Sequence, residues 1–468
     1  MSKRSKQQKR IEVRQQRLFD YYVPGRVGSG GTGAERDTGV ELLSQLERQR
    51  ILTENLLEEV IDYGNLTRSY QQVYNNGGKG GIDGMEVLEL GNWLQKNLKE
   101  LRRQVQREQY KPEAVRKVMI PKASGGKRML GIPTVKDRFI QQSIYQVLNE
   151  YYDPLFSESS YGFRPGRSAH QAIEQACEYV ESGKEWVVDI DLEKFFDKVN
   201  HDRLMQRLSK GIGDKRLLRL IKSYLQAGMM SDGLVEQRTS GTPQGSPLSP
   251  LLSNIVLDEL DKELEKREHS FCRYADDCKI YVRSKRSGER VMKSLTDFIE
   301  QKLKLKVNRK KSGVKHCTES KFLGYTLLPG GAVRVSDVSI KRLKGKIREI
   351  TKRNRGVKFT QIIRELNSMI RGWSNYFRLA NRWLTTLRDI DGWMRRRLRS
   401  YRLKQLGRRY TIFKFLKGFG IPDNTSWNVV MFSGGWWNMS SKKAVRLAMG
   451  KEWFVQNGLL SILQQIVR

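Results

Sequence analysis

The sequence predicts an α/β (α+β) fold over roughly its first two thirds, followed by a mainly helical region. An apolar strand candidate, Trp186–Asp191, ends in a carboxylate. Two β-prone runs within Phe271–Val282 flank adjacent aspartates, as the strands of a hairpin would. Beyond Val335 apolar residues recur mainly at helical spacing, with arginines between aromatic residues.

The amino-terminal part begins with residues 1–37, whose basic, Gln-rich and Gly-rich stretches predict a flexible basic arm. Residues 38–114 are assigned to an amino-terminal extension and the start of the next unit. Apolar residues between Glu41 and Tyr74 predict two short amphipathic helices. The loop after them, Asn75–Gly78, is a simple turn if spacing alone is considered.

The unit predicted over residues 115–330 begins with a hairpin at 115–135, which carries basic side chains at its tip. Helical and strand patterns then alternate, as in an α/β arrangement. Helices are expected at 137–149, 168–181, 201–210, 214–226, after Pro247 and at 288–303, and short strands at 305–307 and 322–327. In the last third, helices are expected at 340–352, 359–375 and 387–406.

The charge balance indicates a polyanionic partner. The formal net charge is +36, from 87 Lys and Arg residues against 51 Asp and Glu residues. Such an excess repels itself in a compact state unless a polyanion shares the surface, so nucleic acid is the expected partner. Residues 331–468 alone hold 30 Lys and Arg against 7 Asp and Glu. The last third is therefore the expected general binding surface.

Other classes of protein fit the composition less well. A basic protein on a membrane surface has a similar charge balance, but no stretch approaches the roughly 18 apolar residues of a spanning helix. Residues 1–19 are polar and basic, without the apolar core of a signal peptide, so a cytoplasmic location is expected. The four cysteines lack paired C-x-x-C spacing and predict ordinary core thiols, with neither a zinc ribbon nor a disulfide framework.

Three carboxylates are the candidates for chemistry. Asp191 ends the first strand candidate, and Asp276 with Asp277 occupies the hairpin tip 85 positions later. In an apolar setting they would repel one another unless cations neutralised them, and hard ions such as Mg²⁺ prefer oxygen ligands. Two such ions can clamp the attacking and leaving oxygens of a phosphoryl displacement. The alternative for an isolated Asp-Asp pair is a plain polar turn.

The flanking motifs favour the chemical interpretation. Tyr274-Ala275-Asp276-Asp277 resembles the Y-x-D-D signature of reverse transcriptases, and Asp191–Asp197 resembles the acidic motif that precedes it. Thr242–Pro250 is similar to the P-Q-G segment of group II intron enzymes, and the resemblance runs from Gly77 to near the carboxyl terminus. It implies a right-hand polymerase with fingers and palm, followed by a helical thumb or maturase domain.

The resemblance also implies a metal site. Asp191, Asp276 and Asp277 are the implied catalytic carboxylates for two Mg²⁺ ions, with Mn²⁺ as another possible metal, and Asp191 and Asp276 are the first choices as ligands. The backbone carbonyl of Leu192 is an implied further ligand. Asp189 points to the same face of the strand as Asp191, and only the motif register selects between them.

The implied deoxynucleotide site draws on three motifs. In the fingers hairpin, basic side chains suit phosphate oxygens, although a solvated basic turn is the plainer interpretation. Phe196 is the implied gate beneath the incoming sugar, whereas residue type alone makes it a core phenylalanine. The glycine of the P-Q-G segment lets backbone approach the substrate. The implied residues are Lys122, Arg128, Phe196, Gln244 and Gly245.

Template contacts are implied on both sides of this site. Asn75–Gly84 is similar to the amino-terminal extension of intron-encoded enzymes, a lid over the template. Tyr161–Ser168 resembles a fingers motif, in which Arg164 and Arg167 touch template or nucleotide.

The basic last third resembles the thumb of maturases. Ile370–Phe377 carries the likeness, within a predicted thumb or maturase domain at 331–410, and residues 411–468 resemble a short DNA-binding region. The charge excess predicts RNA contact through phosphates and stacking, against the plainer interpretation of helix core with a solvated face. The nucleic-acid-binding candidates here are Arg371, Trp373, Tyr376, Arg395, Arg396 and Arg397. No late histidines or cysteine pairs suggest an HNH endonuclease domain.

The function expected from these features is that of a group II intron reverse transcriptase. It would bind intron RNA, assist splicing and copy template RNA from a primer or target DNA, associating with the nucleoid when on DNA. Two alternatives remain: an RNA-binding maturase with dispensable polymerisation, and a free-standing reverse transcriptase in repair or defence.

Overall fold

The computed structural model of the protein describes residues 54–121, 126–231, 234–236, 240–380, 382 and 384–467. The arm predicted at 1–37, the helical pattern before residue 54 and the basic hairpin tip with Lys122 lie outside the described residues. Among the helices that the structure describes, none is both long and apolar enough to span a bilayer.

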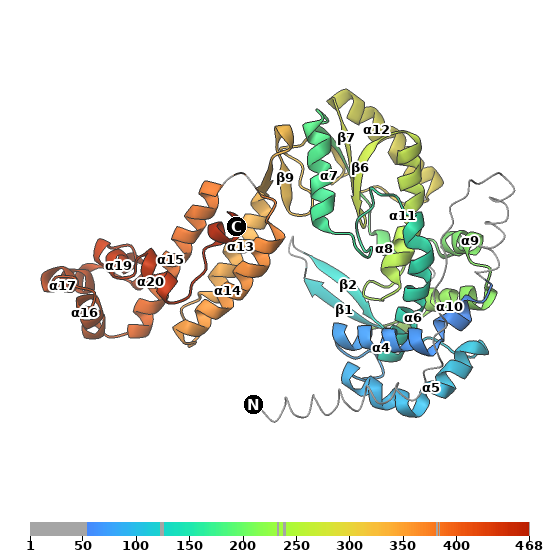
Figure 1. Ribbon diagram of the computed structural model, residues 1–468, viewed down its shortest axis with the longest axis horizontal. Coiled ribbons are helices and arrows are strands. Elements are labelled where there is room, and N and C mark those ends of the chain that lie inside the picture. Colours follow the sequence, from blue (N-terminus) through green and yellow to red (C-terminus); the bar gives the residue numbers. More distant parts are fainter. Residues whose placement is uncertain are drawn as a thin grey trace, which may run out of the picture.

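Helices form the base of the amino-terminal part: α3 (Leu56–Val60), α4 (Tyr63–Asn76), α5 (Leu90–Gln106) and α6 (Val135–Tyr152). α4 begins where the Asp62 side chain accepts hydrogen bonds from two backbone N–H groups, and the Thr134 hydroxyl caps α6 by accepting one, from Asp137 N–H. α4 packs along α6 (Figure 1). α6 confirms the helix expected at 137–149, whereas α5 was not among the expected helices.

The predicted first hairpin belongs to a four-stranded sheet of order β2-β1-β4-β5. β1 (Val115–Pro121) and β2 (Lys127–Ile132) pair antiparallel, which confirms the hairpin. β4 (Met229–Ser231) adds to β1 in parallel, and β5 (Leu234–Glu236) forms the outer edge. We call this the fingers sheet.

A second four-stranded sheet, the palm sheet, is antiparallel throughout and has the order β6-β7-β3-β8. The strand and the acidic-tipped hairpin predicted from sequence are β3 (Trp186–Asp191), β6 (Ser270–Tyr274) and β7 (Asp277–Val282), and β8 (Gly313–His316) completes the sheet. Side chains from one face of β3 enter one hydrophobic cluster, and Val187 on the other face enters a second. The sheet is thus buried on both sides.

Helices surround the palm sheet and connect its strands: α7 (Ala169–Glu181), α8 (Phe195–Lys198), α9 (His201–Gly211), α10 (Lys215–Gln226), α11 (Ser249–Lys266) and α12 (Lys285–Asp297). α7 covers the face of β6 and β9 (Tyr325–Leu327), and α12 lies against β3 and β8. α12 continues as one π-helical turn, Phe298–Lys302.

One expected strand is wrong. Residues 305–307 form no strand, because Leu305 N–H donates to Ile299 at the end of the preceding helical turn. Only Val307 forms an isolated bridge, to Leu192. Leu305 and Val307 are both buried, and backbone hydrogen bonds of 2.8 Å from Glu193 N–H to the Lys306 carbonyl and from Asn308 N–H to the Asp191 carbonyl join the segment to the end of β3. The apolar pattern therefore marked a buried segment whose pairing is too short to form a strand.

The last third is mainly helical, as predicted. β9 pairs with β10 (Val333–Val335), and α13 (Asp337–Ile350), α14 (Phe359–Tyr376) and α15 (Leu384–Leu406) follow. These helices extend away from the palm on the side that faces the fingers hairpin (Figure 1). The remaining helices are α16 (Arg409–Lys417), α17 (Asp423–Phe432), α18 (Trp436–Met439), α19 (Lys443–Ala448), α20 (Lys451–Gln456) and α21 (Ile462–Val467).

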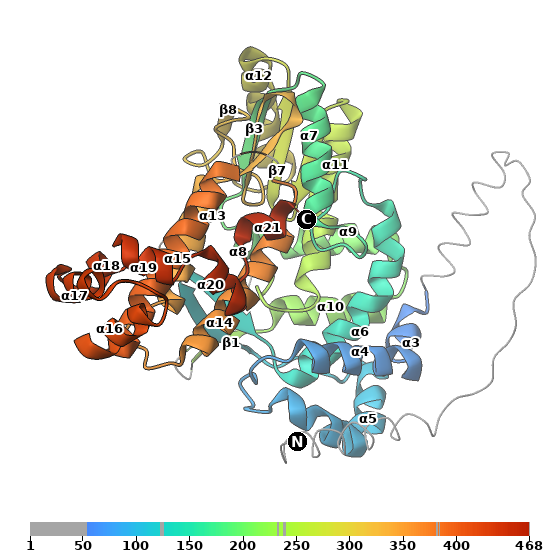
Figure 2. The ribbon, with the colours of Figure 1, turned by 60° about the vertical axis from the view of Figure 1, so that its left-hand side comes forward.

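Residues 411–467 share their hydrophobic core with the preceding helices and with the back of the palm. The chain returns in α21 to pack on α14 and α15 (Figure 2). Asp391 of α15 is buried and accepts hydrogen bonds from the Ser461 hydroxyl and from the N–H groups of Ile462 and Leu463. The predicted boundary at residue 410 therefore does not separate two hydrophobic cores.

Candidate active site

The palm sheet brings the predicted carboxylates to one edge. Asp191 at the end of β3 lies directly opposite Asp277 at the start of β7, and Asp276 occupies the turn beside it. Directly opposed residues of an antiparallel pair point to the same face, so Asp191 and Asp277 share a face with Asp189. Acidic side chains 85 positions apart in sequence thus meet, as predicted.

Lys279 forms ion pairs with two of the carboxylates on this face, Asp189 and Asp277. Its ammonium is almost fully buried and lies 2.5 Å from Asp189 Oδ1 and 3.0 Å from Asp277 Oδ1. Asp189 also has Lys315 at 3.8 Å. Because Asp189 is held by these ion pairs, Asp191 is better placed than Asp189 to face a metal ion.

Asp191 and Asp276 are the other two carboxylates at this edge, and Lys279 pairs with neither of them. The Asp191 side chain is 37% exposed, and among the residues that the structure describes its ion-pair partner is the solvent-exposed Lys311, at 3.3 Å. Burial, together with the negative charge of Asp191, raises the pKa of Asp276. Repulsion between these two carboxylates is the situation that a bound cation relieves.

This donor set fits a divalent cation, although the expected three-carboxylate cluster is not assembled. Within the part of the chain that the structure describes, no three His, Cys, Asp or Glu side chains gather closely enough to hold a metal. The physical reason is that Asp277 turns towards Lys279. Mg²⁺ commonly uses one or two carboxylates and completes its shell with substrate phosphates, so Asp191 and Asp276 are sufficient. Ligand roles for Asp277 and the Leu192 carbonyl stay predictions.

A buried arginine holds the turn that carries Asp276. Arg273 is fully buried, and its guanidinium donates to the Ala275 carbonyl at 2.9 Å and to the Asn254 side chain at 2.9 Å. It also pairs with the carboxylate of Asp261 at 2.5 and 2.7 Å and donates to Ser160 Oγ at 2.7 Å. The bidentate pair fixes the guanidinium plane, and the guanidinium in turn fixes the turn's carbonyl.

Gly162 makes the closest approach to this turn. A Cβ added at Gly162 would lie 2.2 Å from the backbone nitrogen of Ala275, which no side-chain carbon tolerates. The Gly162 carbonyl accepts a hydrogen bond from Asn254, so the backbone cannot withdraw without breaking it.

Gly162→Ala is therefore expected to displace the acidic turn. If the site catalyses primer extension, as the sequence resemblance implies, we expect the rate to fall about 100-fold or more, since misplacement of a site by an ångström costs this much. The measurement is single-nucleotide extension alongside the melting temperature. Gly345→Ala, in α13 at a glycine without a positive φ whose Cβ would meet nothing within 4 Å, is the matched control. Equal activity of the two variants would contradict the expectation.

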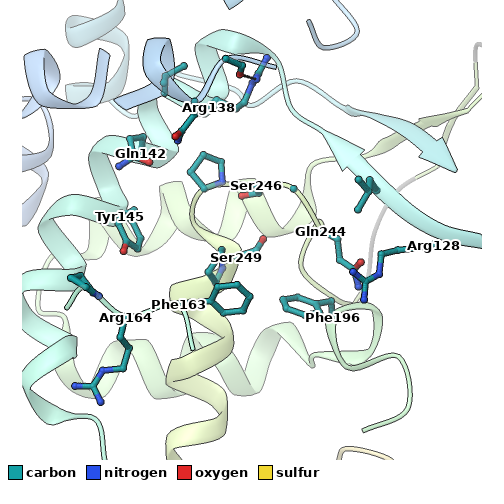
Figure 3. A pocket seen from close by; sticks show the side chains of 18 residues that line it. Arg128, Arg138, Gln142, Tyr145, Phe163, Arg164, Phe196, Gln244, Ser246 and Ser249 are labelled. Carbon is teal, nitrogen blue, oxygen red and sulfur yellow. Dashed lines mark hydrogen bonds between the residues drawn. The ribbon is translucent and has the colours of Figure 1, made fainter. Parts of the chain in front are cut away.

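A cavity of about 720 Å³ lies between the fingers sheet, α6 and α11 (Figure 3). Its lining includes four of the five predicted nucleotide-binding residues, Arg128, Phe196, Gln244 and Gly245. Asn76 and Gly77, from the predicted template lid, line the same cavity. The structure therefore brings together residues that sequence spacing leaves far apart.

Backbone contacts explain the glycine of the P-Q-G segment. Gly245 has φ +112°, and a Cβ there would lie 3.0 Å from the Gly131 carbonyl oxygen. Gly131 N–H donates to the Gln244 carbonyl at 2.9 Å, which joins this segment to β2. Thr242 N–H donates to the Phe196 carbonyl at 2.7 Å and positions the predicted gate.

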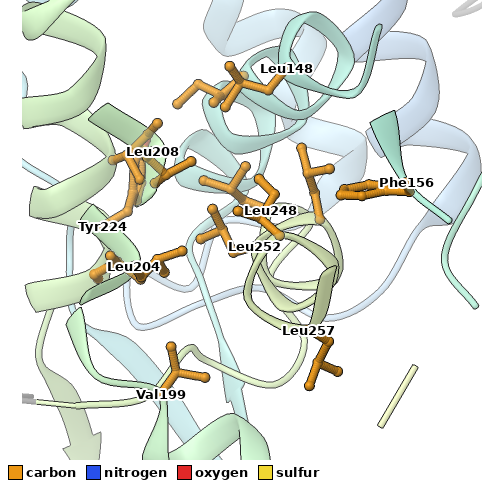
Figure 4. Packing of buried hydrophobic residues seen from close by; sticks show 14 of the residues in the cluster. Leu148, Phe156, Val199, Leu204, Leu208, Tyr224, Leu248, Leu252 and Leu257 are labelled. Carbon is orange, nitrogen blue, oxygen red and sulfur yellow. The ribbon is translucent and has the colours of Figure 1, made fainter. Parts of the chain in front are cut away.

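α11 anchors this loop. Figure 4 shows Leu248 and Leu252, at the start of α11, packed towards Leu204 and Leu208 of α9. The Ser249 hydroxyl donates to the Pro243 carbonyl at 2.8 Å. The loop that lines the cavity is therefore continuous with a rigid, buried helix.

Arg138 ties the predicted lid to the cavity wall. Its guanidinium donates to the carbonyls of Gly77 and Lys79 at 3.2 and 2.7 Å, and the side chain also lines the cavity. Motif reasoning did not single out Arg138. Its position near the start of α6 gave no clear signal, because the buried face of that helix mixes apolar with polar side chains.

The two arginines of the fingers motif have different environments. Arg164 has a buried side chain whose guanidinium is bonded to Asp153 and to the carbonyls of Asp153, Ser157 and Ser160. The structure thus favours a structural role for Arg164 over the predicted template contact, because its donors are occupied within the protein. Arg167 is partly exposed and pairs with Glu158.

The thumb candidates also divide by environment. Arg371 is exposed, whereas the Tyr376 hydroxyl donates to the Leu323 carbonyl at 2.9 Å and joins α14 to the palm. Trp373 packs on Phe377, with ring centroids 4.7 Å apart. Among the α15 arginines, Arg396 stacks on Trp437 at 4.1 Å and Arg397 donates to Thr351. Their contact with nucleic acid, like that of Arg395, stays a prediction.

Comparison with protein families gives two matches. Residues 120–327 match the family described as reverse transcriptase (RNA-dependent DNA polymerase). Residues 340–416 match the group II intron, maturase-specific domain. The first match contains the palm sheet, the fingers sheet except for the first five residues of β1, and the carboxylates Asp191, Asp276 and Asp277. The second match begins within α13 and ends within α16.

Individual relatives agree with these matches. Protein YkfC of Escherichia coli is 32% identical over 287 residues, which cover 53% of this chain and 75% of YkfC. The group II intron-encoded protein LtrA of Lactococcus lactis subsp. cremoris is 29% identical over 352 residues, 60% of this chain and 57% of LtrA. The putative COX1/OXI3 intron 2 protein of Saccharomyces cerevisiae is 30% identical over 287 residues, 49% of this chain and 34% of that protein. The chain thus spans only part of the latter two.

Proposed function

Because this chain belongs to the group II intron-encoded reverse transcriptases and maturases, and is thereby an RNA-directed DNA polymerase, we propose that it copies RNA by divalent-metal nucleotidyl transfer at Asp191 and Asp276. The observation that carries the proposal is the meeting of these carboxylates at one edge of the palm sheet, where the charge of Arg128, which lines the cavity of the predicted nucleotide-binding residues, acts on Asp276. Enzymes of this family use divalent ions, and we propose Mg²⁺, with Mn²⁺ as a substitute.

In this proposal, each part of the site has a separate role. The metal, when bound, supplies Lewis-acid stabilisation of the phosphoryl oxygens. Arg128, whose positive charge acts on Asp276, binds the triphosphate from the fingers side. Phe196 lies under the incoming sugar and excludes a 2′-hydroxyl. The lid at Asn76 and Gly77 covers the template on the far side of the cavity.

Primer extension by the purified protein tests the proposal. The reaction contains an RNA template, a DNA primer, deoxynucleotides and Mg²⁺, and elongation of the primer is the expected result. Failure on every RNA template, by a protein that shows a cooperative melting transition, would overturn the proposal. Chelation of the divalent ion should stop extension at once.

Phe196→Val tests the sugar gate. We expect the ratio of deoxynucleotide to ribonucleotide incorporation to fall by about 10- to 1,000-fold, because a smaller side chain leaves room for a hydroxyl where there was a steric clash. Deoxynucleotide incorporation should change much less. The measurement is kcat/KM for each nucleotide on the same template. An unchanged ratio would assign Phe196 to the core, as residue type alone suggests.

A second role in splicing follows from the maturase match. We propose that the thumb surface binds intron RNA and helps it fold, that the enzyme then extends a primer at target DNA, and that it works in the cytoplasm, on the nucleoid when bound to DNA. The support is the basic last third, together with an aromatic surface on α16 and α17. There, Tyr410 is 56% exposed, its ring centroid lies 6.5 Å from that of Trp427, and the Lys414 ammonium lies over its ring at 4.8 Å. A splicing assay with and without the protein, on RNA from the gene's own flanks, tests this role separately from polymerisation.

A further inference from the structure

Phe163 is the feature of the cavity that the roles above do not explain. It has φ +62°, a left-handed backbone conformation that is a genuine outlier for a bulky side chain. Its side chain is nevertheless 43% exposed and lines the 720 Å³ cavity. A large apolar ring in an unfavourable backbone conformation gains little from burial here. Strain of this kind persists where the surroundings enforce it, and it collects at ligand sites.

Contacts of the residues before and after Phe163 hold its backbone in this conformation. Before Phe163, Gly162 is pressed against the Ala275 nitrogen and its carbonyl is held by Asn254. After Phe163, Arg164 is fixed by four hydrogen bonds to Asp153, Ser157 and Ser160. The chain therefore cannot relax at Phe163 without breaking contacts that also hold the acidic turn.

The position of the ring within the cavity indicates its ligand. Figure 3 shows Phe163 between the side that carries Phe196 and Arg128 and the side that carries Tyr145 and Arg164. On the proposed function, the side with Phe196 and Arg128 takes the sugar and triphosphate of the nucleotide, and the template lies towards the lid, which is bonded to Arg138 at the top of Figure 3. A nucleobase paired across the cavity lies between them, and aromatic rings stack on bases of any sequence.

We infer that Phe163 is a positioning residue that stacks on the templating base, and that its strained backbone is retained because it presents the ring to that base. The inference rests on the proposed function for the identity of the substrate. The contact requires a base at the templating position, but it does not depend on which base that is.

Binding provides a test that does not require catalysis. A primer–template with 2-aminopurine at the templating position is titrated with the full-length protein in the absence of deoxynucleotide. Stacking on Phe163 should quench its fluorescence. Phe163→Ala should abolish most of the quenching, and Phe163→Trp should restore it. Equal quenching by Phe163→Ala and the wild type would overturn the inference even if the enzyme extends primers normally, and quenching without extension would overturn only the proposed function.

Extension provides the second readout. Phe163→Ala should lower kcat/KM for correct insertion by about 5- to 150-fold, the range that base stacking supplies. On a template with an abasic site at the templating position, the wild type and the variant should insert equally slowly. A persistent difference there would show that the ring contacts something other than the template base. Leu155→Ala, at an exposed apolar residue that does not line the cavity, is the matched control.

The backbone strain at Phe163 is tested by comparing two substitutions that remove the ring. Phe163→Ala and Phe163→Gly both remove the ring, but only glycine adopts φ +62° freely. Phe163→Gly should therefore melt about 2 to 4 °C above Phe163→Ala while losing as much activity. If the glycine variant melted no higher than the alanine variant, the backbone would not be strained and the argument from strain would fail.

Discussion

Asp276→Asn is expected to lower primer extension by about 1,000-fold or more while leaving the protein folded. The change removes a charge that the proposed metal requires, and a bound metal contributes several kcal/mol of transition-state stabilisation. Single-turnover extension at saturating Mg²⁺ measures the effect. Asp202→Asn, at an exposed aspartate of α9, is the matched control and should extend as the wild type does.

The same change is expected to stabilise the metal-free protein in a pH-dependent manner. Burial, with the charge of Asp191, raises the pKa of Asp276 above its ordinary 3.8. A carboxyl whose folded pKa exceeds its unfolded pKa destabilises the fold once it ionises, so the cost is absent below the unfolded value and develops as the pH rises through the folded pKa. The melting temperature of Asp276→Asn should exceed that of the wild type at neutral pH, and the difference should shrink towards pH 4, near the ordinary pKa.

Divalent ions should offset this difference in melting temperature between the wild type and Asp276→Asn. Mg²⁺ binds the ionised carboxylates of the native protein, so it should raise the melting temperature of the wild type more than that of Asp276→Asn. An equal rise in both proteins would mean that Asp276 does not take part in metal binding. Residual extension near the wild-type rate would remove Asp276 from the catalytic set altogether.

Arg273→Leu is expected to destabilise the fold by about 3 to 5 kcal/mol, because it leaves the carboxylate of Asp261 buried without its partner. Both side chains of this pair are completely buried. Urea unfolding followed by circular dichroism measures the loss. Arg203→Leu breaks a half-exposed pair with Glu259 and should cost no more than about 1 kcal/mol.

A double variant separates the stability of the Arg273 pair from its effect on the acidic turn. Arg273→Leu combined with Asp261→Leu removes both charges and should recover much of the stability. It should not recover primer extension, because the Ala275 carbonyl still lacks the guanidinium that holds the turn. Recovery of both properties together would show that the pair contributes to stability alone.

The palm strands and the acidic hairpin were predictable because local pattern determines them. Apolar runs flanked by turn residues identified β3, β6 and β7 with bounds within a residue or so of those observed. The register that sets Asp191 opposite Asp277 was not predictable from spacing, since it depends on how distant strands pair. The family motifs supplied that link.

The supporting residues were missed for a physical reason. Arg273 stands in an otherwise apolar strand, which indicates a buried partner, but nothing local identifies Asp261 on α11 as that partner. The strain at Phe163 is equally invisible in sequence, because it arises from contacts of its neighbours with distant loops. The helices after residue 409 were not predicted individually because most of them are short and depend on tertiary packing: α18 and α21 pack on α14 and α15, and α17 and α19 pack on α16.

The hydrogen bonds that join Asp391 to the start of α21 have a consequence for the design of shortened versions of the protein. An expression version trimmed before residue 461 would leave a carboxylate inside the core without its three hydrogen-bond donors. Such a protein should be recovered mostly in inclusion bodies. A purification tag appended after the last helix would leave those donors in position, and soluble yield would distinguish the two designs.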